Sequence, residues 1–128
     1  MSEKNILWVD DDEDLKESLT PLLEMEGWRV TTAGSAEEGK VKAERERPDL
    51  IIMDVMMDGE HGFDATEELK SNPLLANVPV ILYSGVTGKW KETTATREDA
   101  VLTEANEFID KSKDPEVLID AIKKHLGE

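Results

Sequence analysis

The chain has no cysteine among its 128 residues. It therefore forms no disulfide and offers no thiolate metal site, which fits a cytoplasmic setting. It also lacks an apolar run of membrane-spanning length, and no signal-peptide pattern opens it. From these absences we expect a cytoplasmic protein with no membrane partner.

Positive charge is scarce. Fifteen lysines and arginines face thirty acids, and the formal net charge is −15. Such a surface repels phosphate backbones and anionic lipid, so we expect no nucleic acid partner. The excess of acid favours cationic partners or a divalent metal, or it serves only solubility.

Several common site motifs are also missing. There is no glycine-rich phosphate loop and no nucleophile elbow. Asp10–Asp14 resembles the start of an EF-hand loop, but Leu15 stands where glycine is needed and Pro21 where the bidentate glutamate belongs. His61 and His125 lie in no cluster that suggests zinc, and we expect both at the surface.

Two unbroken apolar runs end in acids. Ile6–Val9 is followed by Asp10 and Asp11, and Leu50–Met53 is followed by Asp54. Short runs of this kind are typical of strands buried on both faces of a parallel sheet. A carboxylate at the end of such a strand emerges at the carboxyl edge, where open α/β folds place their chemistry.

Three further strands are expected. Val78–Tyr83 is mostly apolar and indicates another buried strand, which ends at Ser84. Trp28–Thr32 and Glu107–Asp110 alternate apolar and polar residues, which favours the two edges of the sheet.

Helix signals separate the strands. Asp12, Asp114 and the capping box Ser35–Glu38 begin three helices, and Pro48 follows the second. A helix is also expected from about 61 to 71, and a short one from about 98 to 104 after a polar loop over 86–97. The pattern is five βα repeats in one domain, residues 1–128. It predicts a doubly wound, flavodoxin-like α/β three-layer sandwich with parallel strand order 2-1-3-4-5.

That topology places a set of polar side chains along one edge. They are Asp10, Asp11, Asp54, Ser84 and Lys111. Taken singly, each is readily explained as a turn, cap or solvated residue. Together they have a shared chemistry, because clustered carboxylates need a counter-charge and their hard oxygens suit Mg²⁺. A metal, a lysine and a hydroxyl are the parts that hold a phosphoryl group, so Asp54 is a candidate nucleophile.

These segments resemble a response-regulator receiver domain (CheY-like) of two-component signal transduction. The resemblance rests on Ile6–Asp12, Pro48–Met57, Ser84 and Phe108–Lys111, in this order and at matching spacings. It covers essentially the whole chain and implies a phosphoprotein that works in phosphorelay signalling. It implies no enzyme beyond catalysis of its own phosphorylation and dephosphorylation.

The resemblance also implies residue roles. Asp54 matches the phosphoacceptor and Asp11 the direct Mg²⁺ ligand, while Asp10 acts largely through water. Met56 matches the residue whose backbone carbonyl completes the protein ligands, and Lys111 the lysine that pairs with the phosphoryl group.

Two more residues match the family's switch. Ser84 matches the hydroxyl that moves to bond the phosphate, and Phe108 the aromatic that swings inward behind it. The implied donor is a phosphohistidine on a sensor histidine kinase or a histidine phosphotransfer protein, followed by a downstream protein partner. Ser112 departs from the pattern, since a cis proline usually follows the lysine, and we expect a less constrained loop there.

Two other functions remain open at this point. One is a binding module that keeps the fold without phosphorylation. The other is a phosphohydrolase of the haloacid dehalogenase type, with Asp10 and Asp12 as paired acids. The phosphohydrolase is disfavoured because the threonine expected after Asp12 and a cap domain are both missing.

Overall fold

The computed structural model describes residues 3–55, 62–84 and 106–128. Five parallel strands form one sheet in the order β2-β1-β3-β4-β5. Their bounds are β1 Asn5–Val9, β2 Arg29–Ala33, β3 Leu50–Met53, β4 Val80–Ser84 and β5 Glu107–Asp110. The predicted strand order and the two predicted edge strands are confirmed.

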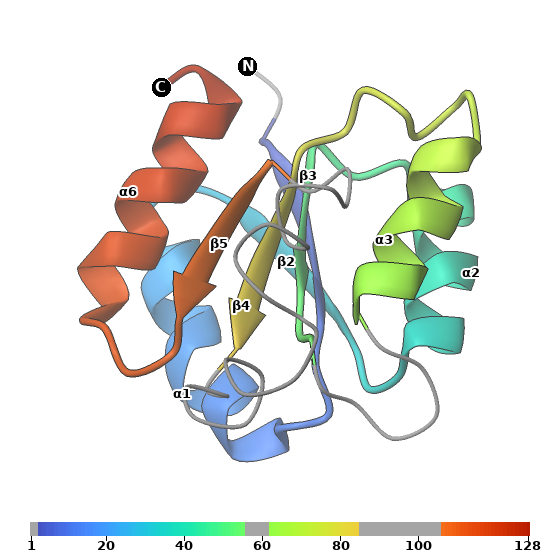
Figure 1. Ribbon diagram of the computed structural model, residues 1–128. Helices are drawn as coiled ribbons and strands as arrows, with labels where there is room; N and C mark the ends of the chain where they lie inside the picture. Colours follow the sequence, from blue (N-terminus) through green and yellow to red (C-terminus); the bar gives the residue numbers. More distant parts are fainter. Residues whose placement is uncertain (1–2, 56–61, 85–105) are drawn as a thin grey trace.

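Helices cover both faces of the sheet. They are α1 Glu13–Glu24, α2 Ala36–Glu46, α3 Gly62–Ser71 and α6 Pro115–Leu126. Figure 1 shows α1 and α6 on one face and α2 and α3 on the other, as the doubly wound fold requires. The loop expected at 86–97 and the helix expected at 98–104 lie outside the described residues. No helix in the described ranges is long and apolar enough to cross a membrane.

The helix starts are fixed by the side chains that the sequence predicts. Asp12 Oδ1 accepts the N–H of Leu15 at 3.0 Å, and Ser35 Oγ accepts that of Glu38 at 3.1 Å. Glu38 reaches back to the N–H of Gly34 at 2.9 Å, one residue before the cap itself. These local bonds fix where α1 and α2 begin after the strands that precede them.

The predicted bounds of three strands were wrong, and β1 begins one residue earlier than predicted, at Asn5. β4 begins at Val80 rather than Val78, because the N–H of Val78 bonds to Leu75 in a turn and its carbonyl accepts Lys70 Nζ at 2.6 Å. At its other end β4 includes Ser84. β2 is also displaced by one residue and ends at Ala33, whose carbonyl accepts the N–H of Asp10 at 2.9 Å.

Side-chain alternation along the strands divides the core in two. Ile6 and Trp8 of β1 join the cluster under α1 and α6, whereas Leu7 and Val9 join the cluster under α2 and α3. All four of these side chains are almost fully buried. The sheet is therefore buried on both faces at β1, as its unbroken apolar run predicts.

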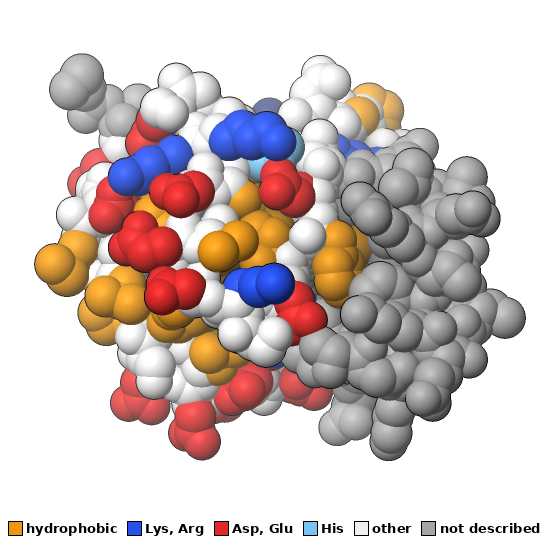
Figure 2. All heavy atoms as spheres, turned by 60° about the vertical axis from the view of Figure 1, so that its left-hand side comes forward, with side chains coloured by type: hydrophobic (Ala, Val, Ile, Leu, Met, Phe, Trp, Pro, Cys, Tyr) orange, Lys and Arg blue, Asp and Glu red, His pale blue; other side chains and the backbone are white. Residues whose placement is uncertain are grey.

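The exposed surface carries the excess of acid. Figure 2 shows the side of the molecule on which α6 lies in Figure 1. On this side Asp and Glu side chains outnumber Lys and Arg around an exposed hydrophobic area. Exposed hydrophobic residues of the described ranges include Leu22, Met25 and Val117.

The outer edge of the sheet at β2 is occupied by polar side chains. Lys42 Nζ donates to the carbonyl of Thr32 at 2.6 Å, and Thr31 Oγ1 donates to Glu46 at 3.1 Å. Both partners come from α2, so this helix covers part of the edge strand.

The helix α2 approaches β1 most closely at Gly39. A Cβ built on Gly39 would lie 2.5 Å from Cγ2 of Val9, which is inside any normal contact distance. Val9 is fully buried and has little room to move.

We expect Gly39→Ala to destabilise the fold by about 1–3 kcal/mol because it overpacks this contact. An uncrowded helix would gain about 0.5–1 kcal/mol from the same change, so the sign of the effect is diagnostic. Urea unfolding measures it, with Val41→Ala on the exposed side of α2 as the control. A stabilised Gly39→Ala protein would contradict the close approach.

Candidate functional site

Asp10, Asp54 and Lys111 meet at the carboxyl edge of the sheet. Each follows its strand and continues the row of side chains that faces α1 and α6, since alternation places residues two apart on one face. Backbone hydrogen bonds continue the sheet up to Asp10 and Asp54. The N–H of Asp10 donates to the carbonyl of Ala33 and the N–H of Asp54 to the carbonyl of Val9, both at 2.9 Å. The two carboxylates are therefore held by β1 and β3.

A lysine lies between the two buried acids. Lys111 Nζ is 2.8 Å from Asp10 Oδ2 and 3.5 Å from Asp54 Oδ2. Asp10 is 0% and Asp54 4% exposed, so both charges have lost nearly all contact with water. The ammonium group is thus the counter-charge that such a site needs.

Asp10 is bound at both of its oxygens. Oδ1 accepts the backbone N–H of Asp12 at 2.9 Å, and Oδ2 accepts the indole N–H of Trp8 at 3.3 Å in addition to Lys111. Trp8 was not among the site residues predicted from the sequence. The missed signal was its position two residues before Asp10, on the same face, together with the need of a buried indole for an acceptor.

Burial and the charges of the site shift two pKa values. Burial alone would lower the pKa of Lys111, but the hydrogen bond and charge of Asp10, with those of Asp54, raise it above its usual value. Burial raises the pKa of Tyr83, whose ring centroid is 5.9 Å from Lys111 Nζ. Lys111 therefore stays cationic and Tyr83 stays neutral at physiological pH.

Ser84 and Phe108 lie in the other row of the sheet. Phe108 pairs with Leu82 in register and packs, half-buried, against the cluster under α2 and α3. Ser84 is 1% exposed and two residues after Leu82, so it shares that face. Its carbonyl accepts the backbone N–H of Lys111 at 2.9 Å, which joins it to the lysine through the main chain. Met56 lies outside the described residues.

The loop after Lys111 is held by Asp110. Its Oδ1 accepts the N–H of Ser112 at 2.8 Å, and its carbonyl accepts that of Lys113 at 3.0 Å. A proline at position 112 would have no N–H for the first of these bonds. The hydrogen bond from the N–H of Ser112 therefore restrains this loop. The sequence analysis expected a looser loop and did not include this bond.

The acids also fit a divalent metal. Asp10, Asp11 and Asp54 each offer a carboxylate oxygen, and these three oxygens lie within 4.8 Å of one another. Hard carboxylate oxygens gathered in this way are the kind of ligand that Mg²⁺ takes in proteins. Asp10 and Asp54 are buried, whereas Asp11 is exposed to solvent.

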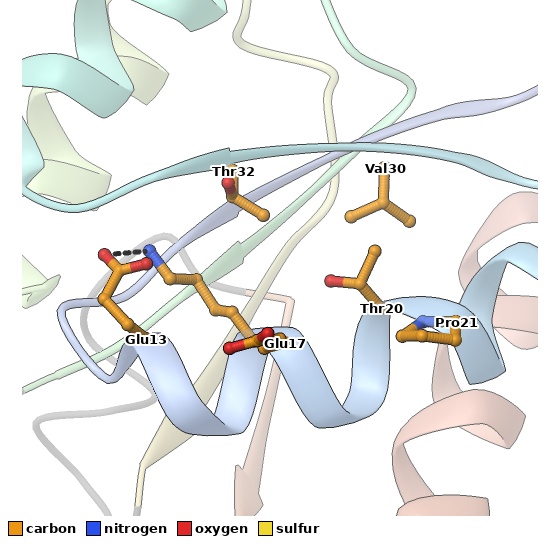
Figure 3. Close-up of a pocket in the computed structure, with 7 residues that line it drawn as sticks. Glu13, Glu17, Thr20, Pro21, Val30 and Thr32 are labelled. Atoms are coloured by element: carbon orange, nitrogen blue, oxygen red, sulfur yellow. Dashed lines mark hydrogen bonds and ion pairs between the residues drawn. The ribbon is translucent and has the colours of Figure 1, made fainter.

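A hollow in the described part of the structure is lined by residues other than these acids. It measures about 410 Å³ and lies between α1 and β2. Figure 3 shows Glu13, Glu17 and Thr20 along its helical side and Val30 and Thr32 on the strand. Lys16 crosses it to bond Glu13 at 3.1 Å and the carbonyl of Ala33 at 3.2 Å. The same carbonyl accepts the N–H of Asp10, so this lysine supports the end of β2 beside the acids.

Comparison with known proteins assigns the family. The model of the response regulator receiver domain matches residues 6–123. Protein PilH of Pseudomonas aeruginosa is 35% identical over 125 residues, which cover 95% of this chain and 97% of PilH. The chain belongs to the response-regulator receiver domain family, and the function of that family is signalling rather than metabolism.

Solved structures agree with the fold. A CheY-like receiver domain protein from Methanospirillum hungatei has a TM-score of 0.87 at 28% identity and covers 98% of this chain and 95% of its own. TrrA of Thermotoga maritima has a TM-score of 0.82 at 29% identity, with 95% and 98% covered. The chain spans only 30% to 52% of the length of several relatives that are transcriptional regulators. These comparisons give no support to the phosphohydrolase or to the phosphorylation-independent module.

We expect Lys111→Met to destabilise the metal-free protein by about 3 kcal/mol, because it leaves the buried Asp10 carboxylate without its counter-charge. Urea unfolding in the presence of a chelator measures the loss. Lys113→Met removes an exposed lysine two residues away and serves as the matched control. Equal stability of the two variants would show that the ion pair contributes nothing.

Proposed function

We propose that this chain, residues 1–128, is a single receiver domain that accepts a phosphoryl group on Asp54. The observation that supports it best is the convergence of Asp54 with Lys111 and the acid pair Asp10 and Asp11. A carboxylate oxygen of Asp54 attacks the phosphorus of a phosphohistidine, and a P–O bond forms as the P–N bond breaks. The imidazole nitrogen leaves with the electron pair and takes up a proton, so the product is an acyl phosphate.

Lys111 supports this reaction by its charge. It already lies 3.5 Å from Asp54, and a short movement from Asp10 would bring its ammonium to an oxygen of the new phosphoryl group. Asp11 and Asp54 are the candidate direct ligands of Mg²⁺, with the carbonyl of Met56 as a third and Asp10 acting through water. When bound, Mg²⁺ would neutralise and orient the phosphoryl oxygens. TrrA of Thermotoga maritima was crystallised in complex with Mg²⁺–BeF, which supports this assignment by similarity.

The response to phosphorylation is assigned to Ser84 and Phe108. They lie in one row on neighbouring strands, with Phe108 beside Leu82 and Ser84 two residues farther along β4. In this proposal the hydroxyl of Ser84 turns to the phosphoryl group, and Phe108 moves inward into the space behind it. The population then shifts towards a conformation with a different affinity for a partner.

The proposed donor is a sensor histidine kinase or a histidine phosphotransfer protein, and the downstream partner is another protein. The strongly acidic surface supports protein partners over nucleic acid for this chain. The proposal includes a cytoplasmic location, because the phosphohistidine donor would have to be present in the same compartment.

Asp54→Asn is expected to abolish phosphorylation and leave the fold intact, since the amide cannot form the acyl phosphate. Intact-protein mass after incubation with acetyl phosphate measures the transfer, with and without Mg²⁺. The wild-type protein should gain one phosphoryl group only when the metal is present. A variant labelled at another residue would overturn the assignment of Asp54.

Two controls separate the alternatives. Turnover of many equivalents of a small phosphate ester would favour a phosphohydrolase, because a receiver is labelled once. A wild-type protein that gains no phosphoryl group but forms a beryllofluoride complex would indicate rapid loss of the group. Failure of both reactions would favour a binding module that keeps the fold without phosphorylation.

A further inference from the structure

The indole of Trp8 lies against the acid site but belongs to none of the roles described so far. Its Nε1 donates to Asp10 Oδ2 at 3.3 Å, and this is the same oxygen that Lys111 Nζ contacts at 2.8 Å. Asp10 is therefore shared between a cation and a neutral donor. The two donors, Lys111 and Trp8, differ in how freely they can move away from Asp10.

Lys111 is a mobile partner for Asp10. Its ammonium is bonded to Asp10 and lies within 4 Å of Asp54, at the end of a long side chain that is 15% exposed. A phosphoryl group on Asp54 would attract it with more negative charge than the present carboxylate. Asp10, which is fully buried, would then lose its ion pair at the moment the site gains charge.

Trp8 is a fixed partner. Trp8 is 0% exposed near the end of β1, and its ring packs edge-on against Tyr83 with centroids 6.1 Å apart and planes at 61°. The indole N–H carries no charge, so the phosphoryl group does not draw it away from Asp10. A buried carboxylate that keeps a hydrogen bond is far less costly than one left bare.

We propose that Trp8 is a positioning residue whose indole N–H holds the Asp10 carboxylate while Lys111 exchanges Asp10 for the phosphoryl group on Asp54. The inference rests on the proposed function for the exchange itself, but the Trp8–Asp10 bond acts on metal binding even without phosphorylation. With the Asp12 N–H on Oδ1, it fixes the orientation of the Asp10 carboxylate, which would act on Mg²⁺ through water. Groups that orient metal ligands in this way commonly change metal affinity by an order of magnitude.

The test compares Trp8→Phe with Trp28→Phe. Both remove a buried indole and leave a ring, but the indole of Trp28 donates to Glu128 at 3.2 Å instead of to an acid of the site. We expect calorimetry to give about a tenfold weaker Mg²⁺ affinity for Trp8→Phe and an unchanged one for Trp28→Phe. An unchanged Mg²⁺ affinity in folded Trp8→Phe would overturn the role of Trp8.

Phosphorylation by acetyl phosphate gives a second readout. In Trp8→Phe the Mg²⁺ concentration for half-maximal rate should rise about tenfold, and the rate at saturating Mg²⁺ should stay within about twofold of wild type. A loss of packing alone would not produce this split. A wild-type protein that binds Mg²⁺ but neither gains a phosphoryl group nor forms a beryllofluoride complex would overturn the proposed function and leave the metal-binding role of Trp8 standing. A wild-type protein that binds no Mg²⁺ would overturn both.

The wild-type protein provides a measurement that does not depend on the folding of a variant. The Trp8 indole N–H resonance can be assigned by its contacts with the Tyr83 ring. We expect it to shift on addition of Mg²⁺, to stay protected from exchange when beryllofluoride is added, and to saturate at the concentration found by calorimetry. The Trp28 indole should not respond. A Trp8 indole N–H resonance that does not shift on addition of Mg²⁺ would contradict the proposal.

Discussion

The ion pair between Lys111 and Asp10 joins the ends of two strands that are not neighbours. Asp10 follows β1 and Lys111 follows β5, and β3 and β4 lie between them in the sheet. Asp54 follows β3, so it lies under this bridge and is the second acid that the lysine contacts. Any new negative charge at Asp54 therefore competes directly with the bond that joins β1 to β5. A change of charge in the site therefore also changes the contact that holds the two strand ends together at this end of the sheet.

The support for this bridge is built from rigid parts. Alternation along β1 places Trp8 and Asp10 on one face, and Tyr83 of β4 packs against the indole from the same side. The main chain contributes as well, because Ser84 and Lys111 are joined by a backbone hydrogen bond and Asp110 holds the turn that follows. The lysine side chain is long and lies within reach of two acceptors, Asp10 and Asp54. In the proposed function it is the component that moves.

Much of the fold could be predicted from the sequence because its patterns are physical constraints. Unbroken apolar runs require burial on both faces, so Ile6–Val9 and Leu50–Met53 had to be inner strands. The acids that follow these parallel strands must therefore lie at the same edge of the sheet. The sequence could not predict that Lys111 lies nearer to Asp10 than to Asp54, since its distances to the two carboxylates differ by less than 1 Å. The bounds of β4 also escaped prediction, because contacts from α3 and its turn fix Val78 outside the strand.

The bond from Lys42 to the carbonyl of Thr32 has a consequence for how copies of the protein behave at high concentration. β2 is an edge strand, and an exposed edge is a template on which another chain can add a strand. Lys42 occupies one of the acceptors that such pairing requires, and it places a positive charge where an incoming backbone would lie. A second copy would have to displace this ammonium before its own N–H groups could bond there. The sheet is thereby kept at five strands, and self-association through backbone pairing is discouraged at this edge.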